Sequence, residues 1–300
     1  MRKIISFFAF VAIVFSFAAC GGKDGNVPDI NGGNGNGNNN GGNGEQANEI
    51  AALPGKFTIN PDGDQVQFSP GCLYGGPVGV TFWMNHIGHG ANTPGCYFSW
   101  GTGDDPTYRG TKSKFVDWGL NPVLIEKQGE GWRTLSADEW MHLFSGRDHA
   151  KYLCGFAEVQ HLSISYRGCL LFPDNAYEQY FSSGRLNLPD NMIFKPYAIS
   201  NLFIYGESTN KYSAAEWEKL ERGVGAVFIR EIGQMAGTSY LHGPGYDAVY
   251  CWTSTPTDGD DTKAKCLVMQ DGFTFSNVIR DVVREIQNPV RLVKNVPQSE

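Results

Sequence analysis

The chain has 300 residues, of which 41% are hydrophobic and 13% aromatic, and its formal net charge is −7. This composition can bury a large core, which excludes disorder along the whole chain. An acidic chain has no surplus of basic side chains to neutralise phosphates, which argues against a nucleic-acid partner.

Residues 1–19 are predicted to be a lipoprotein signal peptide. Arg2 and Lys3 form a short basic start, and residues 4–19 are almost continuously apolar. This run is shorter than the roughly 20 residues of a membrane-spanning helix. It ends FAACG, and small residues before a cysteine resemble the bacterial lipobox. That resemblance implies lipid attachment at Cys20 and a protein anchored in the outer membrane at the cell surface. The alternatives are an ordinary signal peptide and an uncleaved anchor.

Residues 20–52 are predicted to be a disordered tether. Positions 21–52 hold 10 Gly and 9 Asn and no aromatic residue. Such a stretch cannot bury enough apolar surface to offset the entropy lost on ordering. A flexible coil of this length reaches roughly 30 Å, enough to hold a domain away from a membrane. Residues 53–297 are predicted to be one domain, because no second linker interrupts them.

Seven cysteines occur in the sequence, and six remain once Cys20 is assigned to the lipid. An even number in an exported protein suggests disulfides. Pairing neighbours along the chain gives the shortest loops and is the expected connectivity. The sequence also allows some of them to stay reduced as small buried apolar groups. The disulfide candidates are Cys72, Cys96, Cys154, Cys169, Cys251 and Cys266.

The domain is predicted to start with a β-hairpin and to contain two helices. Residues 56–60 and 65–68 alternate in polarity around the turn sequence PDGD. Each helix begins with Ser followed three residues later by Glu, which is the pattern of a capping box. The pairs are Ser136 with Glu139 and Ser213 with Glu216, and the helices are expected to end near Gly146 and Gly223. Both Glu side chains thus have a structural role, and neither is a candidate catalytic acid.

The C-terminal part is predicted to form strands at residues 225–230, 250–255, 264–269 and 288–293. The turn between residues 257 and 261 carries the densest acidic cluster, Asp258, Asp260 and Asp261. Its carboxylate oxygens would suit calcium or a sugar, and a solvated hairpin tip is the other interpretation. Tyr246 is a further ligand-loop candidate, because an exposed aromatic ring can stack on a sugar or peptide; Tyr240 and Tyr250 are similar.

Four segments, in their order along the chain, resemble one group of proteins. Residues 131–140 (GWRTLSADEW) are similar to the "GWR-L-P-T-x-x-EW" segment of the major paralogous domain family of bacterial surface lipoproteins. The other three segments are residues 216–228, which resemble "W-x-x-L-x-x-x-G-A-V-F-L-P", residues 252–255 (WTST), which resemble "WSST", and residues 290–293 (VRLV), which resemble "SVRLV". The resemblance covers about residues 56–294. Position 230 is Arg where the family has Pro.

This resemblance implies an α+β, C-type-lectin-like fold related to the formylglycine-generating enzymes, with a twisted antiparallel core sheet, two helices and long loops. Those enzymes use a closely spaced cysteine pair, whereas Cys251 and Cys266 are 15 residues apart. We therefore expect a non-enzymatic surface protein that binds a glycan or a protein, with no cofactor except a calcium ion if the acidic turn holds one. The alternatives are an oxidase or hydrolase of that superfamily and a structural subunit of a surface assembly.

Overall fold

A computed structural model describes residues 51–76, 79–82, 94–161, 164–182, 188–196, 210–242, 248–270 and 278–298. The chain divides into two units, Met1–Gly44 and Glu45–Glu300, and every described element belongs to the second. That unit is α+β, with many strands and few helices. Cys20 and Tyr246 lie outside the described residues. In the part that is described, no helix is long and apolar enough to cross a membrane.

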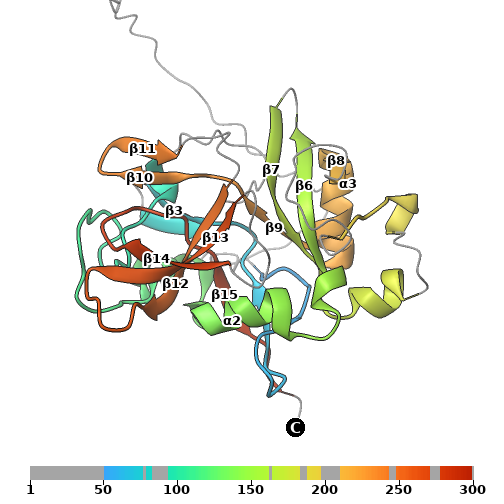
Figure 1. Ribbon diagram of the computed structural model, residues 1–300, viewed down its shortest axis with the longest axis horizontal. Helices are drawn as coiled ribbons and strands as arrows, with labels where there is room; N and C mark the ends of the chain where they lie inside the picture. The colour runs from blue at the N-terminus through green and yellow to red at the C-terminus, as the bar shows by residue number, and fades with distance from the viewer. Residues whose placement is uncertain are drawn as a thin grey trace, which may run out of the picture. The chain divides into compact units, whose positions relative to one another are not determined.

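The elements are short and follow one another closely (Figure 1). The strands are β1 (Phe57–Thr58), β2 (Gln65–Phe68), β3 (Leu73–Gly76), β4 (Gly79–Phe82), β5 (Trp132–Thr134), β6 (Cys154–His161), β7 (Ile164–Leu171), β8 (Asn210–Ser213), β9 (Val227–Arg230), β10 (Gln234–Ala236), β11 (Ser239–His242), β12 (Ala248–Pro256), β13 (Lys263–Gln270), β14 (Ile279–Val283) and β15 (Leu292–Asn295). The α-helices are α1 (Pro122–Gln128), α2 (Ala137–Met141) and α3 (Ala214–Lys219). The short 3-10 and π turns used below are η1 (Pro94–Cys96), η3 (His142–Gly146) and η8 (Leu220–Val224).

The first sheet has the order β1-β2-β15-β5 and joins the two ends of the domain. β1 and β2 form the predicted hairpin, with Phe57 opposite Val66. The closing strand β15 lies centrally, pairing with β2 on one side and β5 on the other. Val66, Phe68 and Val293 are fully buried in the same apolar cluster, so one face of this sheet is core. The predicted hairpin is confirmed, and the closing strand is present but covers Leu292–Asn295 instead of residues 288–293.

The second sheet has the order β8-β6-β7-β9 and is buried on both faces. The long hairpin β6–β7 is antiparallel, and β8 adds to it in parallel. Helix α3 contacts β6 and β8 and lies beside them in Figure 1. Trp217 of α3 belongs to the apolar cluster on that face, and Leu171 of β7 belongs to the cluster shared with the first sheet. The first and second sheets therefore share one core.

In the third sheet, β12-β13-β14, the strands β12 and β13 are buried on both faces, and alternate residues enter different apolar clusters. Val249 and Leu267 belong to the cluster shared with the other sheets, whereas Tyr250, Trp252 and Val268 belong to a separate aromatic cluster. Tyr250 is only 6% exposed. The expectation that it is an exposed stacking platform is therefore wrong.

Both predicted capping boxes are present. In each, the Ser side chain accepts a hydrogen bond from the Glu amide, and the Glu side chain accepts one from the Ser amide. Helix α2 continues through η3 to Gly146 as expected. Helix α3 continues through η8 to Gly225, two residues past the expected end, because Gly225 adopts the left-handed φ of 82° that closes such an end. Helix α1, which the sequence analysis missed, starts at the cap Asn121 with Pro122 in its first turn.

Two glycines at the end of η8 differ in the space around them, so they test how closely the chain packs there. A Cβ on Gly225 would lie 2.5 Å from Gly55, and its φ is positive. A Cβ on Gly223 would meet nothing within 4 Å. We predict that Gly225→Ala lowers the free energy of unfolding by roughly 2–4 kcal/mol. Gly223→Ala is expected to change it by less than about 1 kcal/mol. Denaturant unfolding measures both, and equal effects would contradict the close approach of Gly55 and Gly225.

Candidate functional site

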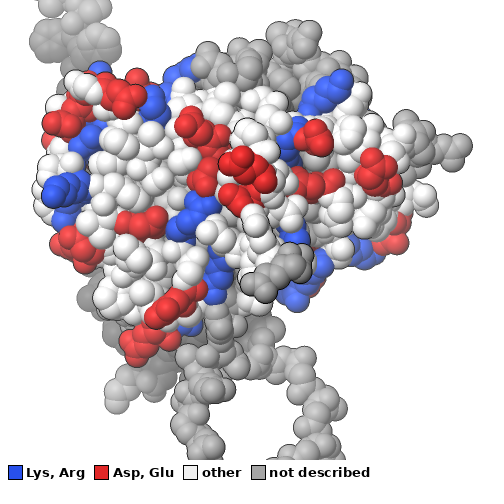
Figure 2. Space-filling model, turned by 90° about the horizontal axis from the view of Figure 1, so that it is seen from below, with Lys and Arg blue, Asp and Glu red and all other residues white. Residues whose placement is uncertain are grey.

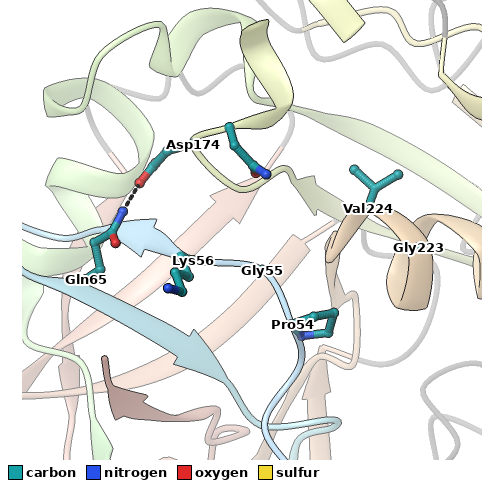
Figure 3. A pocket seen from close by; sticks show the side chains of 8 residues that line it. Pro54, Gly55, Lys56, Gln65, Asp174, Gly223 and Val224 are labelled. Atoms are coloured by element: carbon teal, nitrogen blue, oxygen red, sulfur yellow. Dashed lines mark hydrogen bonds between the residues drawn. The ribbon is translucent and has the colours of Figure 1, made fainter. Parts of the chain in front are cut away.

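A polar pocket of about 390 Å³ opens where the first two sheets meet (Figure 3). Its walls come from the segment before β1, from β2, from the turn after β7 and from the end of η8. The lining residues are Pro54, Gly55, Lys56, Gln65, Asp174, Asn175, Gly223 and Val224. A volume of this size lies within the range of small-ligand sites. The sequence analysis singled out none of these side chains as functional.

The Asp174 carboxylate forms one wall and is held by four donors. Its Oδ2 accepts hydrogen bonds from the Thr58 amide at 2.8 Å, the Thr58 hydroxyl at 2.7 Å and the Gln65 Nε2 at 3.1 Å. Its Oδ1 accepts one from Arg147 Nη1 at 3.0 Å. The Asp174 amide also donates to the Lys56 carbonyl. Asp174 therefore fixes β1 and β2 to the turn that follows β7.

Arg147 supplies the opposite charge from inside the core. Its side chain is only 1% exposed, and its Nε donates to the Leu143 carbonyl at 2.9 Å. Its guanidinium carbon lies 5.5 Å from the centre of the Phe57 ring. Burial lowers the pKa of Arg147 from its usual value, and the Asp174 carboxylate opposes that shift. Without Asp174, a charged group would remain buried with no counter-ion close to it.

Three side chains keep polar atoms available to a ligand. Lys56 and Asn175 are exposed, and Gln65 donates its Nε2 to Asp174 while its Oε1 remains an acceptor. Together they offer an ammonium, an amide and a carbonyl oxygen around one concave surface. Because both Asp174 oxygens accept hydrogen bonds from donors of the protein, this side chain supports the wall of the pocket.

One of the three carboxylates in the acidic turn, the ligand-loop candidate of the sequence, is held by interactions within the turn. Asp260 Oδ1 accepts from the Thr262 amide at 3.0 Å and from its hydroxyl at 2.5 Å, and its Oδ2 lies 3.0 Å from Lys263 Nζ. Hydrogen bonds from Thr262 and Lys263 lower the pKa of Asp260 to about 2. Asp258 and Asp261 are exposed on the same turn between β12 and β13. Among the described residues, no group of three His, Cys, Asp or Glu side chains could hold a metal ion.

The six candidate cysteines are all free thiols in the structure. Cys251 pairs in register with Leu267, and Cys266 pairs with Trp252, so their side chains point to opposite faces of the sheet. A Cys251–Cys266 bridge is therefore wrong, because a disulfide requires the two Cβ atoms to face each other. Cys154 and Cys169 share a face but are offset by two residues in the ladder, since Cys154 lies opposite Leu171 and Cys169 lies opposite Phe156.

Figure 2 shows acidic and basic side chains interspersed on one face of the molecule. On that face, the described residues form no continuous basic stripe of the kind that follows a nucleic-acid backbone. The chain matches no protein-family model, no curated protein and no solved structure. The functional inference therefore depends on the pocket, the fold and the sequence.

We predict that Asp174→Asn lowers the free energy of unfolding by about 2–4 kcal/mol, because it leaves Arg147 buried without its counter-ion. The double variant Arg147→Met with Asp174→Asn should recover part of that loss, because no buried charge then remains. The control is Asp104→Asn, which breaks an exposed pair with Lys112 and should cost less than about 1 kcal/mol. Strictly additive losses in the double variant would contradict the pairing of Asp174 with Arg147.

Proposed function

We propose that this chain is an exported lipoprotein, anchored through Cys20 in the outer membrane, whose folded unit binds a polar surface ligand without reacting with it. Three features support this proposal: the leader that ends in a lipobox-like segment, the Gly- and Asn-rich tether, and a folded unit with a polar pocket. A tethered domain samples the space above a membrane, which suits capture of a ligand at the cell surface.

We also propose that the folded unit is of the C-type-lectin-like type, related to the major paralogous domain lipoproteins. Three of the four resembling segments come together in space, which supports the proposal. The segment 131–140 forms β5 and the start of α2, and β5 pairs with β15, the end of the VRLV segment. The WTST segment contacts the start of α2, since the Ser254 amide donates to the Leu135 carbonyl and the Ala137 amide donates to the Thr255 hydroxyl.

A glycan is the ligand class that the pocket favours. A sugar presents hydroxyl groups that both donate and accept hydrogen bonds, and Lys56, Asn175 and Gln65 offer both kinds of partner. None of the eight lining residues is aromatic, so binding depends on hydrogen bonds and is expected to be weak at one site. Many lipoprotein copies on one membrane would strengthen the overall binding to a multivalent glycan through avidity. The observation that carries the proposal is this concave set of unused polar groups on a rigid support.

The enzyme alternative has less support in the described residues. An oxidase of the formylglycine-generating type needs an accessible, closely spaced pair of reactive cysteines. Burial raises the pKa of Cys251 and of Cys266 well above the usual value, and the two thiols face opposite sides of their sheet. A buried thiol with a raised pKa is a poor nucleophile. Binding without catalysis is therefore the better supported function.

Filling the pocket tests the site. Gly223 lines it and has open space where a side chain would begin, so we predict that Gly223→Phe folds normally and obstructs the pocket. On an array of bacterial and host glycans, the parent chain and Gly223→Ala should share hits that Gly223→Phe loses by at least about tenfold. Retention of those hits by Gly223→Phe would exclude this pocket as the site, and an array without hits would contradict glycan binding.

The anchor has a separate test. We predict that Cys20→Ala abolishes incorporation of labelled fatty acid, because the acylated sulfur is gone, and that the leader stays attached. Metabolic labelling with palmitate, followed by mass measurement of the purified chain, reads out both effects. Cys72→Ala is the control and should keep the label. A parent chain that carries no label, or a leader removed at another residue, would show that Cys20 is not the lipid attachment.

A further inference from the structure

The cysteines of the folded unit differ in how far a reagent in solution can reach them. Cys154, Cys169, Cys251 and Cys266 are at most 1% exposed. Cys72, in contrast, is only partly buried. Among the described cysteines, an oxidant in the solvent would therefore meet Cys72 first.

Cys96 lies next to Cys72 because η1 packs directly on β3. Cys72 immediately precedes β3, and Cys96 is the last residue of η1. A Cβ on Gly95 would lie 2.4 Å from both the Gly75 carbonyl oxygen and the Tyr74 ring, so the two segments are in close contact. The β10–β11 hairpin is close to this contact, since Met235 of β10 belongs to the same apolar cluster as Cys96 (Figure 1).

The two thiols share one small apolar cluster. Cys96 forms it with Tyr97, Ile232 and Met235, and Cys72 packs against it. Burial raises the pKa of Cys96 to about 12, and the neighbouring Cys72 thiol adds to the rise. The shared apolar cluster is the observation that brings the two thiols together.

The other pairings of chain neighbours are disfavoured by sheet geometry. Cys251 and Cys266 face opposite sides of the third sheet. Cys154 and Cys169 are diagonal partners in the β6–β7 ladder, where Cα atoms are about 7–8 Å apart. A disulfide usually spans 4.4–6.8 Å between Cα atoms, so this pair would require the backbone to move. Of the three pairs of chain neighbours, Cys72 with Cys96 is the one that these sheet registers do not disfavour, and its two residues pack in one cluster.

We propose that Cys72 and Cys96 form a disulfide after export and that the other four cysteines of the folded unit remain thiols. The inference uses the export that the proposed function assumes, but not the identity of the ligand. The oxidant is a disulfide compound, either a low-molecular-weight disulfide or a dithiol oxidase of the envelope. The bridge would connect β3 to η1 and close a loop of about 25 residues.

The exchange balances in two steps. The Cys72 thiolate attacks the disulfide of the oxidant, forming a mixed disulfide and releasing one thiolate of the oxidant. Cys96 then gives its proton to water, and its sulfur attacks the Cys72 sulfur of the mixed disulfide and releases the second thiolate. This second attack is intramolecular, and that proximity offsets the small thiolate fraction of a thiol whose pKa is raised. The protein loses two electrons and two protons in total, and the disulfide of the oxidant gains the two electrons.

Mass mapping of the full chain tests the connectivity. The protein is purified from the cell envelope, denatured in N-ethylmaleimide to label its thiols, and digested without reduction. We expect one linked peptide pair, Cys72 with Cys96, and N-ethylmaleimide on the other four cysteines of the folded unit. A bridge between any other pair overturns the proposal, including Cys72 with Cys251, whose thiols also influence each other electrostatically.

Oxidation in vitro separates the pairing from the export. The reduced full chain is incubated with oxidised glutathione, and formation of the Cys72–Cys96 bridge supports the pairing. If this bridge forms in vitro but the chain purified from cells carries only thiols, the pairing stands and export is contradicted. Failure to form the bridge in both samples overturns the pairing.

Melting measurements provide a second readout. For a loop of this length, dithiothreitol should lower the melting temperature of the oxidised chain by roughly 5–10 °C. This difference should vanish in Cys72→Ala and in Cys96→Ala, and it should persist in the control Cys251→Ala. A shift that survives in Cys96→Ala would show that another pair is responsible.

Discussion

The rest of the fold depends on the ion pair between Asp174 and Arg147. A guanidinium that is 1% exposed can remain charged in the core only if a carboxylate and other acceptors surround it. Asp174 meets this need from the turn after β7 and at the same time accepts hydrogen bonds from β1 and β2. One side chain therefore fixes the first sheet against the second, and the pocket lies where the two meet.

In this arrangement, some residues hold the wall of the pocket and others present polar atoms to a ligand. The groups that bind Asp174 are occupied within the protein, whereas Lys56 and Asn175 extend from the same segments with free polar atoms. Small binding sites commonly have this form, in which a rigid scaffold positions a few polar groups. The close approach of Gly55 and Gly225 adds to the rigidity, because neither position has room for a side chain. A binding function needs such a surface, and it needs no activated nucleophile.

Local signals in the sequence predicted much of the fold. The capping boxes at Ser136 and Ser213, the hairpin of β1 and β2 and the closing strand β15 depend on residues a few positions apart, and all were predicted. Helix α1 was missed, although Asn121 followed by Pro122 is a start signal for a helix. The Cys251–Cys266 bridge was wrong because the register of β12 against β13, which determines the face of each side chain, cannot be read from spacing alone.

The pocket could not be predicted, because its residues come together over long distances in the chain. Asp174 bonds to Thr58, 116 residues away, and to Gln65, 109 residues away. Sequence analysis named the acidic turn as a ligand-loop candidate, because a cluster of charged residues is visible locally in the sequence. In the structure, the Asp260 carboxylate closes that turn, while Asp258 and Asp261 are exposed.

Nuclear magnetic resonance with an isotope-labelled chain and a glycan from the array tests the central claim most directly. On addition of the glycan, the backbone and side-chain chemical shifts of Lys56, Gln65 and Asn175 should change. The chemical shifts of the turn at Asp258–Asp261 should stay the same. Shifts concentrated in that turn, or no shifts in the pocket at saturating glycan, would contradict the account.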